Sequence, residues 1–427
     1  MSETRRNFRA VIGAIGGNAL EWYDFAIFSY MIPLISDLFF ADSSHRGAGG
    51  LLLSTALFAV GFVSRPIGGI VLGYYGDRRG RQASMLLGMG IMAIAVAMMT
   101  CAPTYQQAGP VGAIMIALAR LLQGFSVGGE FATSTTFLVE MAPAGRRGFF
   151  GSWQITGQII AQVLGGTVGY VMSTFFSTAT IHAYAWRLPF ALGLLIVPVV
   201  LLIRLSAARG ATMRPRTPPA ASSFYRSFGA QWRQIAAGMG LVTASTVSFY
   251  IIYGYVVTYA SRVLHLSVTH AYLVQMSAAA SMLLVVPFSG YLSDRIEKRW
   301  IILAALVSYL ALIWPLYSWL LSAPSIGRLV VLQVTLSVAS GMFLGAYVTL
   351  ITEILTPQTR TTMLAIVNNA VVMVVGGGSQ FIVTWLITVT GRAMAPAFFV
   401  MTGVLIGVIA ACALLISPSL RRPNAAS

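Results

Sequence analysis

Long apolar runs separated by short polar segments dominate the chain. A helix needs ~20 apolar residues to cross a bilayer, and about twelve runs reach or approach that length. The predicted spans are residues 11–40, 48–75, 83–102, 109–140, 149–175, 184–206, 232–261, 268–293, 300–322, 326–353, 361–391 and 395–416. The segment between the sixth and seventh spans is rich in Pro, Ser and Arg. The pattern predicts an all-α membrane protein with a six-helix bundle at 1–206, a hydrophilic linker at 207–231 and a second six-helix bundle at 232–427.

The composition agrees with this pattern and excludes several functional classes. Charged residues make up only 9% of the chain, whereas a soluble domain carries ~25%. The net charge of +16 comes from dispersed basic residues, whereas nucleic-acid binders cluster them on one surface. The four histidines and two cysteines show no metal-site spacing, and no Walker-type Gly-Lys-Ser/Thr motif is present. We therefore expect the lipid bilayer as a partner, but no nucleic acid, no metal, no cofactor and no enzyme activity.

Basic residues are unevenly divided between the two sets of predicted loops. One set, which includes both termini and the linker, holds most of them. The opposite set offers only Arg46, Arg187, Arg262, Arg328 and Arg392. Because cytoplasmic loops are the ones enriched in Lys and Arg, both termini and the linker are predicted to lie in the cytoplasm.

The two halves of the chain carry matching motifs in the same order. GYYGDRRGRQ follows the second predicted span, and GYLSDRIEKR follows the eighth. The fourth span ends at Glu140, seven residues before Arg147, and the tenth ends at Glu353, seven residues before Arg360. These correspondences imply duplication of a six-helix unit. Such repeats are typical of transporters, whose sites lie at the repeat interface near the bilayer midplane.

The repeated loop resembles the signature loop of the major facilitator superfamily, although Gln82 replaces a basic residue in the first copy and Glu297 replaces a glycine in the second. The segments GNALEWYDF, SRPIGG, ARLLQGFSVGGE, EMAPAGRRGF and WRLPF together resemble the metabolite:proton symporter family, which includes citrate, α-ketoglutarate, shikimate and proline/betaine carriers. GFFGSWQITGQ and SWLLSAPSIGR look most similar to the citrate and tricarballylate carriers. The resemblance covers essentially the whole chain. It implies twelve transmembrane helices in two bundles, alternating access, and a location in the bacterial inner membrane.

The first predicted span carries Asn18, Glu21 and Asp24. A carboxylate at the bilayer centre costs about 2.5 kcal/mol or more, so two of them must face protein or water. At ~100° per residue, Glu21 and Asp24 lie ~60° apart on one helix face. We predict that they line a substrate or proton path. The alternative is a helix–helix salt bridge that only fixes packing.

The fourth predicted span carries Arg120, Gln123 and Glu130 on one broad face. In sugar–proton symporters of the superfamily, an Asp on helix one pairs with an Arg on helix four until the Asp is protonated, and the resemblance implies these roles for Asp24 and Arg120. Burial and a neighbouring cation act on a carboxyl group in opposite directions, so a conformational change can load or release the proton. We predict that Asp24 or Glu21 carries the proton with Arg120 as its partner, and that Glu130 is a reserve candidate. A permanently locked structural pair is the alternative.

Several residues are candidates for substrate binding. The planar guanidinium of arginine binds a carboxylate through two hydrogen bonds, and a tricarboxylate needs more than one cation, so Arg120 is predicted to act with Arg65 or Arg187. Arg187 can instead be an interfacial residue that only reaches toward the membrane surface. The other candidates are Asn18, Gln154, Gln158, Gln162, Tyr250, Tyr253 and Asn368. The three glutamines recur every fourth residue, and hydrogen bonding between helices is their alternative role.

The signature loops predict a gate. In the superfamily these loops close the inner side by charge pairing between helices, and the resemblance implies that role for Asp77, Arg78, Arg81, Glu140, Arg147, Asp294, Arg295, Glu353 and Arg360. The first copy is expected to pair with Glu140 and with Arg146 or Arg147. Membrane topology alone is the alternative explanation of the arginines, but it does not account for Asp77 and Glu140.

We therefore expect a proton-coupled symporter, active as a monomer, that imports citrate or a related tri- or dicarboxylate by alternating access. A symporter for betaine, proline, shikimate or α-ketoglutarate would share most of these motifs. A drug efflux pump, which would use the aromatic and methionine residues of the same cavity, is a further alternative, and a membrane receptor that transports nothing is a remote third.

Overall fold

The computed structural model describes residues 3–40, 48–79, 81–128, 130–194, 198, 229–357 and 359–416, and in this part of the chain all regular elements are helical. The first half contains α1 (Glu3–Tyr30), α2 (Ile32–Phe39), α3 (Ala48–Val63), α4 (Arg65–Arg79), α5 (Arg81–Cys101), α6 (Tyr105–Ala108), α7 (Val111–Val127), α8 (Glu130–Glu140), α9 (Arg147–Phe175), α10 (Thr178–Ala183) and the 3₁₀ turn η1 (Ala185–Arg187). The second half contains α13 (Trp232–Val247), η2 (Ser248–Gly254), α14 (Val256–Thr258), η3 (Tyr259–Val263), α15 (Val268–Leu292), α16 (Lys298–Ser322), α17 (Ile326–Glu353), α18 (Arg360–Val371), η4 (Val372–Gly376), α19 (Gly377–Thr390) and α20 (Ala395–Ile416).

The predicted all-α membrane fold is confirmed. Among the described residues, nine helical stretches are long and apolar enough to cross a membrane. They match nine of the predicted spans, with α3 and α4, α7 and α8, and α18 to α19 each running on as one stretch. Helices α1 and α5 occupy the first and third predicted spans. Most of the predicted sixth span beyond residue 194, and the linker up to residue 228, lie outside the described residues.

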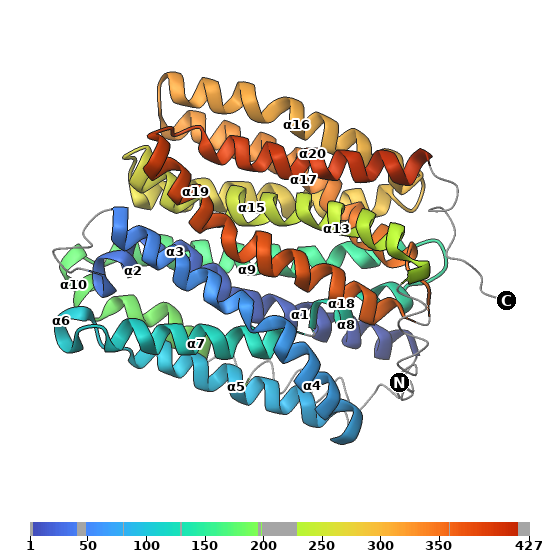
Figure 1. Cartoon of the computed structure of the whole chain (residues 1–427), viewed down its shortest axis with the longest axis horizontal. Coiled ribbons are helices and arrows are strands. Elements are labelled where there is room, and N and C mark those ends of the chain that lie inside the picture. The colour runs from blue at the N-terminus through green and yellow to red at the C-terminus, as the bar shows by residue number, and fades with distance from the viewer. Residues whose placement is uncertain are drawn as a thin grey trace.

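The two halves lie side by side with their helices roughly parallel to one long axis (Figure 1). Helices of the first half form the lower part of this view, and α13 to α17 and α20 form the upper part. The halves meet where α9 packs against α15 and α3 packs against α19. A site between the halves is therefore built from both copies of the repeat.

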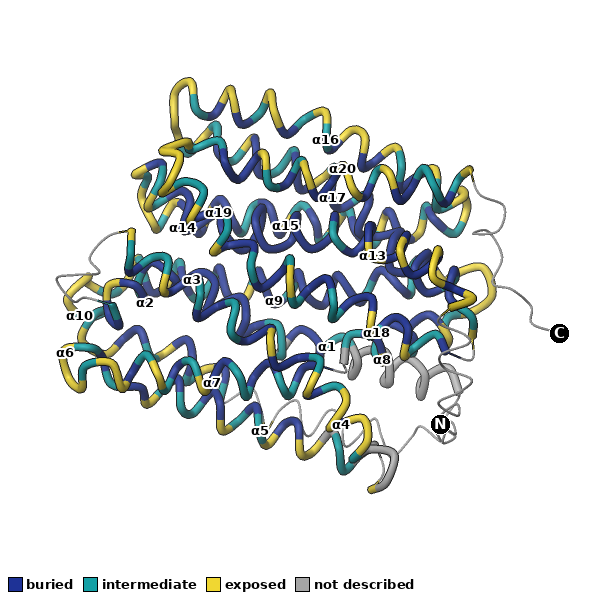
Figure 2. Tube along the Cα trace, viewed as in Figure 1, coloured by how far each residue is buried: buried dark blue, intermediate teal, exposed yellow. Residues whose placement is uncertain are grey.

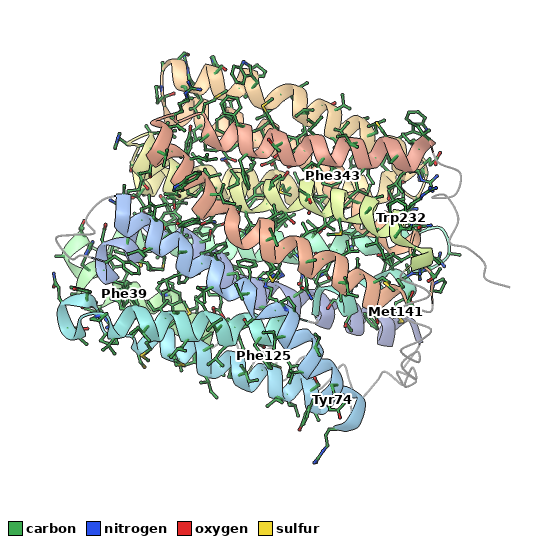
Figure 3. The ribbon with its side chains drawn as sticks, viewed as in Figure 1. Phe39, Tyr74, Phe125, Met141, Trp232 and Phe343 are labelled. Carbon is green, nitrogen blue, oxygen red and sulfur yellow. The ribbon has the colours of Figure 1, made fainter. Side chains whose placement is uncertain are left out.

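The outer surface of the bundle is apolar. Ile70, Leu284 and Ile409 are 74%, 76% and 62% exposed, and Figure 2 shows exposed residues along the outer side of α16 with buried residues where the halves meet. In Figure 3 the side chain of Phe343, which is fully buried, lies inside the second half. Large apolar residues at such exposure suit lipid chains rather than water.

The two ends of the bundle are distinct. We call the end that carries Glu140, Asp294 and Arg360 the inner end, because the arginine distribution predicts that it faces the cytoplasm. Trp232 and Met141 lie at this end in Figure 3, and Phe39 lies toward the opposite, outer end. Trp232 is 58% exposed and stacks with Arg233, as is typical of residues at a membrane–water interface.

Two glycines set the close approach of α7 to the α3–α4 helix. A Cβ atom on Gly124 would collide with the carbonyl oxygen of Gly61, and one on Gly128 would collide with that of Arg65. Small residues four apart allow such contact between membrane helices. The packing of α7 thereby fixes the backbone from which Arg65 projects.

Candidate functional site

A cavity lined by residues of both halves lies between them. It is lined by Asn18, Glu21, Trp22, Arg65, Val127, Phe131, Gln158, Ser245, Thr246, Phe249, Tyr250, Tyr347, Asn368, Asn369 and Val372. The first half contributes α1, α4, α7, α8 and α9, and the second half contributes α13, η2, α17, α18 and η4.

Arg65 is the cationic residue of this cavity among the lining side chains that the structure describes. It is 3% exposed, and its guanidinium carbon lies 4.1 Å and 4.5 Å from the ring centres of Phe62 and Phe25. Its Nε and Nη2 atoms are buried and make no hydrogen bond of good geometry within the described residues, and the guanidinium interacts with the Tyr250 hydroxyl beside it. Leaving such donors unpaired is costly, so the arrangement suits an anion that accepts hydrogen bonds.

Neutral polar groups surround this cation. Asn18 and Gln158 line the cavity from the first half, and Asn368 and Asn369 line it from the second. The Asn369 amide donates to the Gly128 carbonyl oxygen at 2.7 Å and so joins the halves. These amides, with the hydroxyls that line the same cavity, can bind the hydroxyl and carboxyl groups of a small metabolite.

Three aromatic residues lie between this cavity and a second one. Trp22, Phe249 and Tyr250 line both cavities. The ring centre of Trp22 lies 5.2 Å from that of Phe249 and 6.3 Å from that of Tyr250. The second cavity reaches Ser29 and Gly254, which are further toward the outer end. We call Trp22, Phe249 and Tyr250 the aromatic partition.

Asp24 and Arg120 lie away from this cavity, inside the first half. Asp24 is 4% exposed, and its Oδ1 atom faces Gly193 and has no hydrogen-bond partner in the described structure. Arg120 is fully buried, donates to the Gln123 side chain at 2.9 Å and to the Phe58 carbonyl oxygen at 3.3 Å. Asp24 and Arg120 interact electrostatically, but no ion pair joins them within the described residues.

Phe25 connects the two groups of charges. The guanidinium carbon of Arg65 lies 4.5 Å from the centre of its ring, and that of Arg120 lies 4.4 Å from the same centre. A movement of one guanidinium therefore changes the position of the Phe25 ring against which the other guanidinium packs. Arg120, which the sequence analysis expects to bind substrate, does not line the main cavity, and it packs against the same ring as the cavity residue Arg65.

Other candidate binding residues have varied positions. Tyr250, Gln158, Asn18 and Asn368 line the main cavity, and Gln162 lines the second one. Gln154 and Tyr253 line neither cavity. Gln154 pairs with Asn18, and Tyr253 hydrogen-bonds to Ser340 at 2.5 Å, so both hold helices together.

Arg187 lies at the outer side, where the sequence places the start of the sixth span. It donates to the Ala102 carbonyl oxygen at 2.9 Å and stacks on Trp186, near the outer end. Arg187 lines neither cavity, and both its predicted role in substrate binding and its interfacial alternative stay predictions.

Contacts close the inner end. Arg360 Nη1 of the second half lies 3.7 Å from Glu140 Oε1 of the first half. Asp294 accepts hydrogen bonds from the backbone N–H groups of Gly148 and Phe149, at 2.6 Å and 2.9 Å, where α9 begins. A carboxylate at a helix N-terminus is stabilised by the helix dipole, so Asp294 ties the halves together.

The remaining gate candidates are less directly involved or are not described. Glu353 pairs with Lys298 of its own half at 3.3 Å, and Arg295 stacks on Tyr291. Arg147 contributes its carbonyl oxygen, which accepts from Thr349 at 3.2 Å. The side chains of Asp77, Arg78, Arg81 and Glu130 lie outside the described residues.

The outer end is closed by an ion pair that the sequence did not predict. Arg262 Nη2 lies 2.5 Å from Asp37 Oδ2 and donates to the Pro33 carbonyl oxygen at 2.9 Å. Deeper in the bundle than this ion pair, the Gln380 side chain donates a hydrogen bond to Ser29, and Ser29 donates one to the Gly254 carbonyl oxygen. Asp37 lies near the end of the first apolar run, and a charged residue at that position was the sequence feature that could have indicated this ion pair.

Sequence comparison identifies the family. Residues 14–371 and 239–427 match the pattern of the Major Facilitator Superfamily. The chain is 33% identical to a citrate-proton symporter from Klebsiella pneumoniae over 405 residues, which are 94% of this chain and 90% of that protein. It is 29% identical to the proline/betaine transporter of Escherichia coli strain K12 over 415 residues, 94% of this chain and 82% of that protein.

Structure comparison agrees on the fold. A crystal structure of a D-xylose-proton symporter superposes with a TM-score of 0.76, at 18% identity, over 97% of this chain and 98% of that one. The predicted resemblance is thus confirmed by sequence and by fold. The family consists of transporters rather than enzymes. This chain is a multi-pass membrane protein that belongs to the Major Facilitator Superfamily.

Proposed function

We propose that the protein imports a small organic acid together with protons, and that citrate or a related tri- or dicarboxylate is the substrate. The observation that carries the proposal is the Arg65 guanidinium, which is buried at the cavity, interacts with the Tyr250 hydroxyl and keeps two nitrogen atoms that make no hydrogen bond of good geometry within the described residues. A carboxylate bound there gains charge-assisted hydrogen bonds. The similarity to citrate-proton symporters supports this substrate class.

The closed ends support alternating access. The cavity lies between the Glu140–Arg360 pair at the inner end and the Asp37–Arg262 pair at the outer end. Opening one pair while the other stays closed exposes the cavity to one side of the membrane at a time. Asp24 carries the proton in this scheme, with Arg120 as the partner whose position changes with its charge.

A second candidate substrate is a zwitterion such as betaine or proline. The specific observation is Glu21, a carboxylate that lines the same cavity as Arg65 and as the aromatic rings of Trp22, Phe249 and Tyr250. A carboxylate and aromatic rings bind an ammonium group, while Arg65 binds the acid group. The similarity to the proline/betaine transporter gives this candidate further support.

The orientation and the working unit are part of the proposal. We place both termini and the linker in the cytoplasm of a bacterium, with the protein in its inner membrane and active as a monomer. The excess of basic residues in those segments supports the orientation.

A binding assay on purified protein tests the substrate. Radiolabelled citrate is displaced by a panel of tri- and dicarboxylates, shikimate, proline, betaine and an amphipathic drug. We expect displacement by carboxylates with two or three acid groups, and loss of citrate binding in Arg65→Gln. Displacement by betaine and proline but not by dicarboxylates would establish the zwitterion instead, and displacement by the drug alone would favour efflux.

A further inference from the structure

The neutral polar side chains that line the main cavity fall into two groups. In the first group the side chains already bind other parts of the protein. Asn18 pairs with Gln154, and the Asn369 amide donates to the Gly128 carbonyl oxygen. Ser245 interacts with the hydroxyl of a neighbouring tyrosine. These groups serve to hold helices together.

The second group consists of Gln158 on α9, Thr246 on α13 and Asn368 on α18. These side chains are 3%, 4% and 6% exposed, and all three line the cavity. Within the part of the chain that the structure describes, no hydrogen bond joins any of these side chains to another residue. Because burying polar groups without partners is costly, these positions suit a ligand that forms hydrogen bonds.

Thr246 and Asn368 belong to one wall of the cavity. A Cβ atom on Gly376 would lie 3.1 Å from the Thr246 methyl group and 3.2 Å from Val372, so Thr246 and Val372 pack on the same glycine. The Val372 N–H donates to the carbonyl oxygen of Asn368, one helical turn earlier. Helix α18 packs against α13 of its own half and against α8 of the first half. The second half therefore supplies an unpaired amide and hydroxyl to the cavity, whereas the first half supplies Arg65.

The chemistry of this wall favours a substrate hydroxyl group. An ionised carboxylate only accepts hydrogen bonds, so it would leave the amide oxygen of Asn368 without a donor. An ammonium group only donates, so it would leave the amide N–H groups without an acceptor. A hydroxyl group does both, and it can donate to the Asn368 oxygen while it accepts from Thr246.

We propose that Asn368 and Thr246 determine specificity for hydroxylated polycarboxylates, because they bind the substrate hydroxyl group while Arg65 binds a carboxylate. The inference rests on the proposed function and narrows its substrate class. Citrate and malate are favoured over tricarballylate and succinate, which are the same acids without the hydroxyl group. Gln158, on the first half, supplies amide N–H groups to a further carboxylate of the substrate.

Binding of matched acids to full-length protein in nanodiscs, at one fixed pH, tests this assignment. Radiolabelled citrate is displaced by citrate, tricarballylate, malate and succinate, so each pair differs by one hydroxyl group. The wild type should bind the hydroxylated acid of each pair about tenfold more tightly, the effect of two hydrogen bonds between neutral groups. Asn368→Leu and Thr246→Val keep much of the side-chain shape and remove the polar groups. Each should weaken citrate binding several-fold and leave tricarballylate binding unchanged.

Thr243→Val on the same helix is the matched control. The Thr243 hydroxyl donates to the Met239 carbonyl oxygen and lines neither cavity, so this variant should keep the wild-type preference. Retained tricarballylate binding shows that a variant is folded, and where one variant binds neither acid the other variant decides.

Three results would overturn the inference and leave the proposed substrate class in place. They are equal wild-type affinities within each pair, an unchanged preference in either variant, and an equal loss of both acids in the two variants. A wild type that binds no polycarboxylate would overturn the proposed function, and this inference with it.

Discussion

The Arg65 side chain combines a charge with a fixed orientation. Phe62 and Phe25 pack against the guanidinium, and the close contact of Gly128 with the Arg65 carbonyl oxygen fixes the backbone. Because the rings of Phe62 and Phe25 hold the planar guanidinium in place, its N–H donors point in one direction. The side chain is therefore suited to recognise the two oxygen atoms of a carboxylate together.

Arg65→Lys tests this geometry. Lysine keeps the charge but loses the planar donor pair and the stacking, so we expect citrate affinity to fall by about tenfold or more, the range of about 1.5–3 kcal/mol for a charged hydrogen bond. Isothermal titration measures the change. Arg187→Lys is the matched control, and an Arg65→Lys protein with wild-type affinity would show that charge alone suffices.

Some of the cavity residues could be predicted from the sequence, and others could not. Glu21, Asp24, Arg65 and Arg120 were found because ionisable residues within apolar runs are rare and functional. The division into residues that line the cavity and residues that do not was not predicted, because helix periodicity gives the face of one helix but not the packing of neighbouring helices against it. Ser245 and Thr246 were missed, although they precede Phe249 and Tyr250 by one helical turn.

At the scale of elements, the contact of α7 with the α3–α4 helix supports the site. Gly128→Ala adds a methyl group against the Arg65 carbonyl oxygen, so we expect a loss of about 1–3 kcal/mol in stability, typical of overpacking, together with weaker citrate binding. Thermal unfolding in detergent measures the first effect. Gly90→Ala on α5 is the control, since a Cβ atom there meets no other atom within 4 Å. Equal melting temperatures for the two variants would argue against a tight contact.

The inner-end pair gives a second prediction at this scale. Arg360→Glu places two carboxylates together where Glu140 and Arg360 now pair, so we expect the inner end to open and transport to fall several-fold. The double variant Glu140→Arg/Arg360→Glu restores opposite charges and should recover part of the activity. Spin-label distances across the inner end report the opening. No recovery in the double variant would mean that the pair does not hold this gate.

The gate was partly predictable from the repeat. The equal spacing of Glu140 to Arg147 and Glu353 to Arg360 marked the gate residues, but not their partners. In the structure Glu140 pairs with the arginine of the other copy, whereas Glu353 pairs with Lys298 of its own half. Lys298 corresponds in the repeated motif to Arg81, whose side chain lies outside the described residues.

At the scale of the whole molecule, the two halves differ in charge. Arg120 stands twenty residues before Glu140, and Gln333 stands twenty residues before Glu353. Both side chains are buried within their own half, at 0% and 2% exposure. The position that is cationic in the first half is therefore neutral in the second. We therefore expect proton-linked changes to be concentrated in the first half, while the second half supplies the other wall of the cavity.

Accumulation of radiolabelled citrate in proteoliposomes tests the central claim, that a buried carboxylate couples protons to movement of the substrate. With an acidic exterior, the wild type should concentrate citrate inside the vesicles until a protonophore collapses the gradient. Asp24→Asn should abolish this accumulation and still exchange labelled for unlabelled citrate. Accumulation by Asp24→Asn at the wild-type rate would contradict the account.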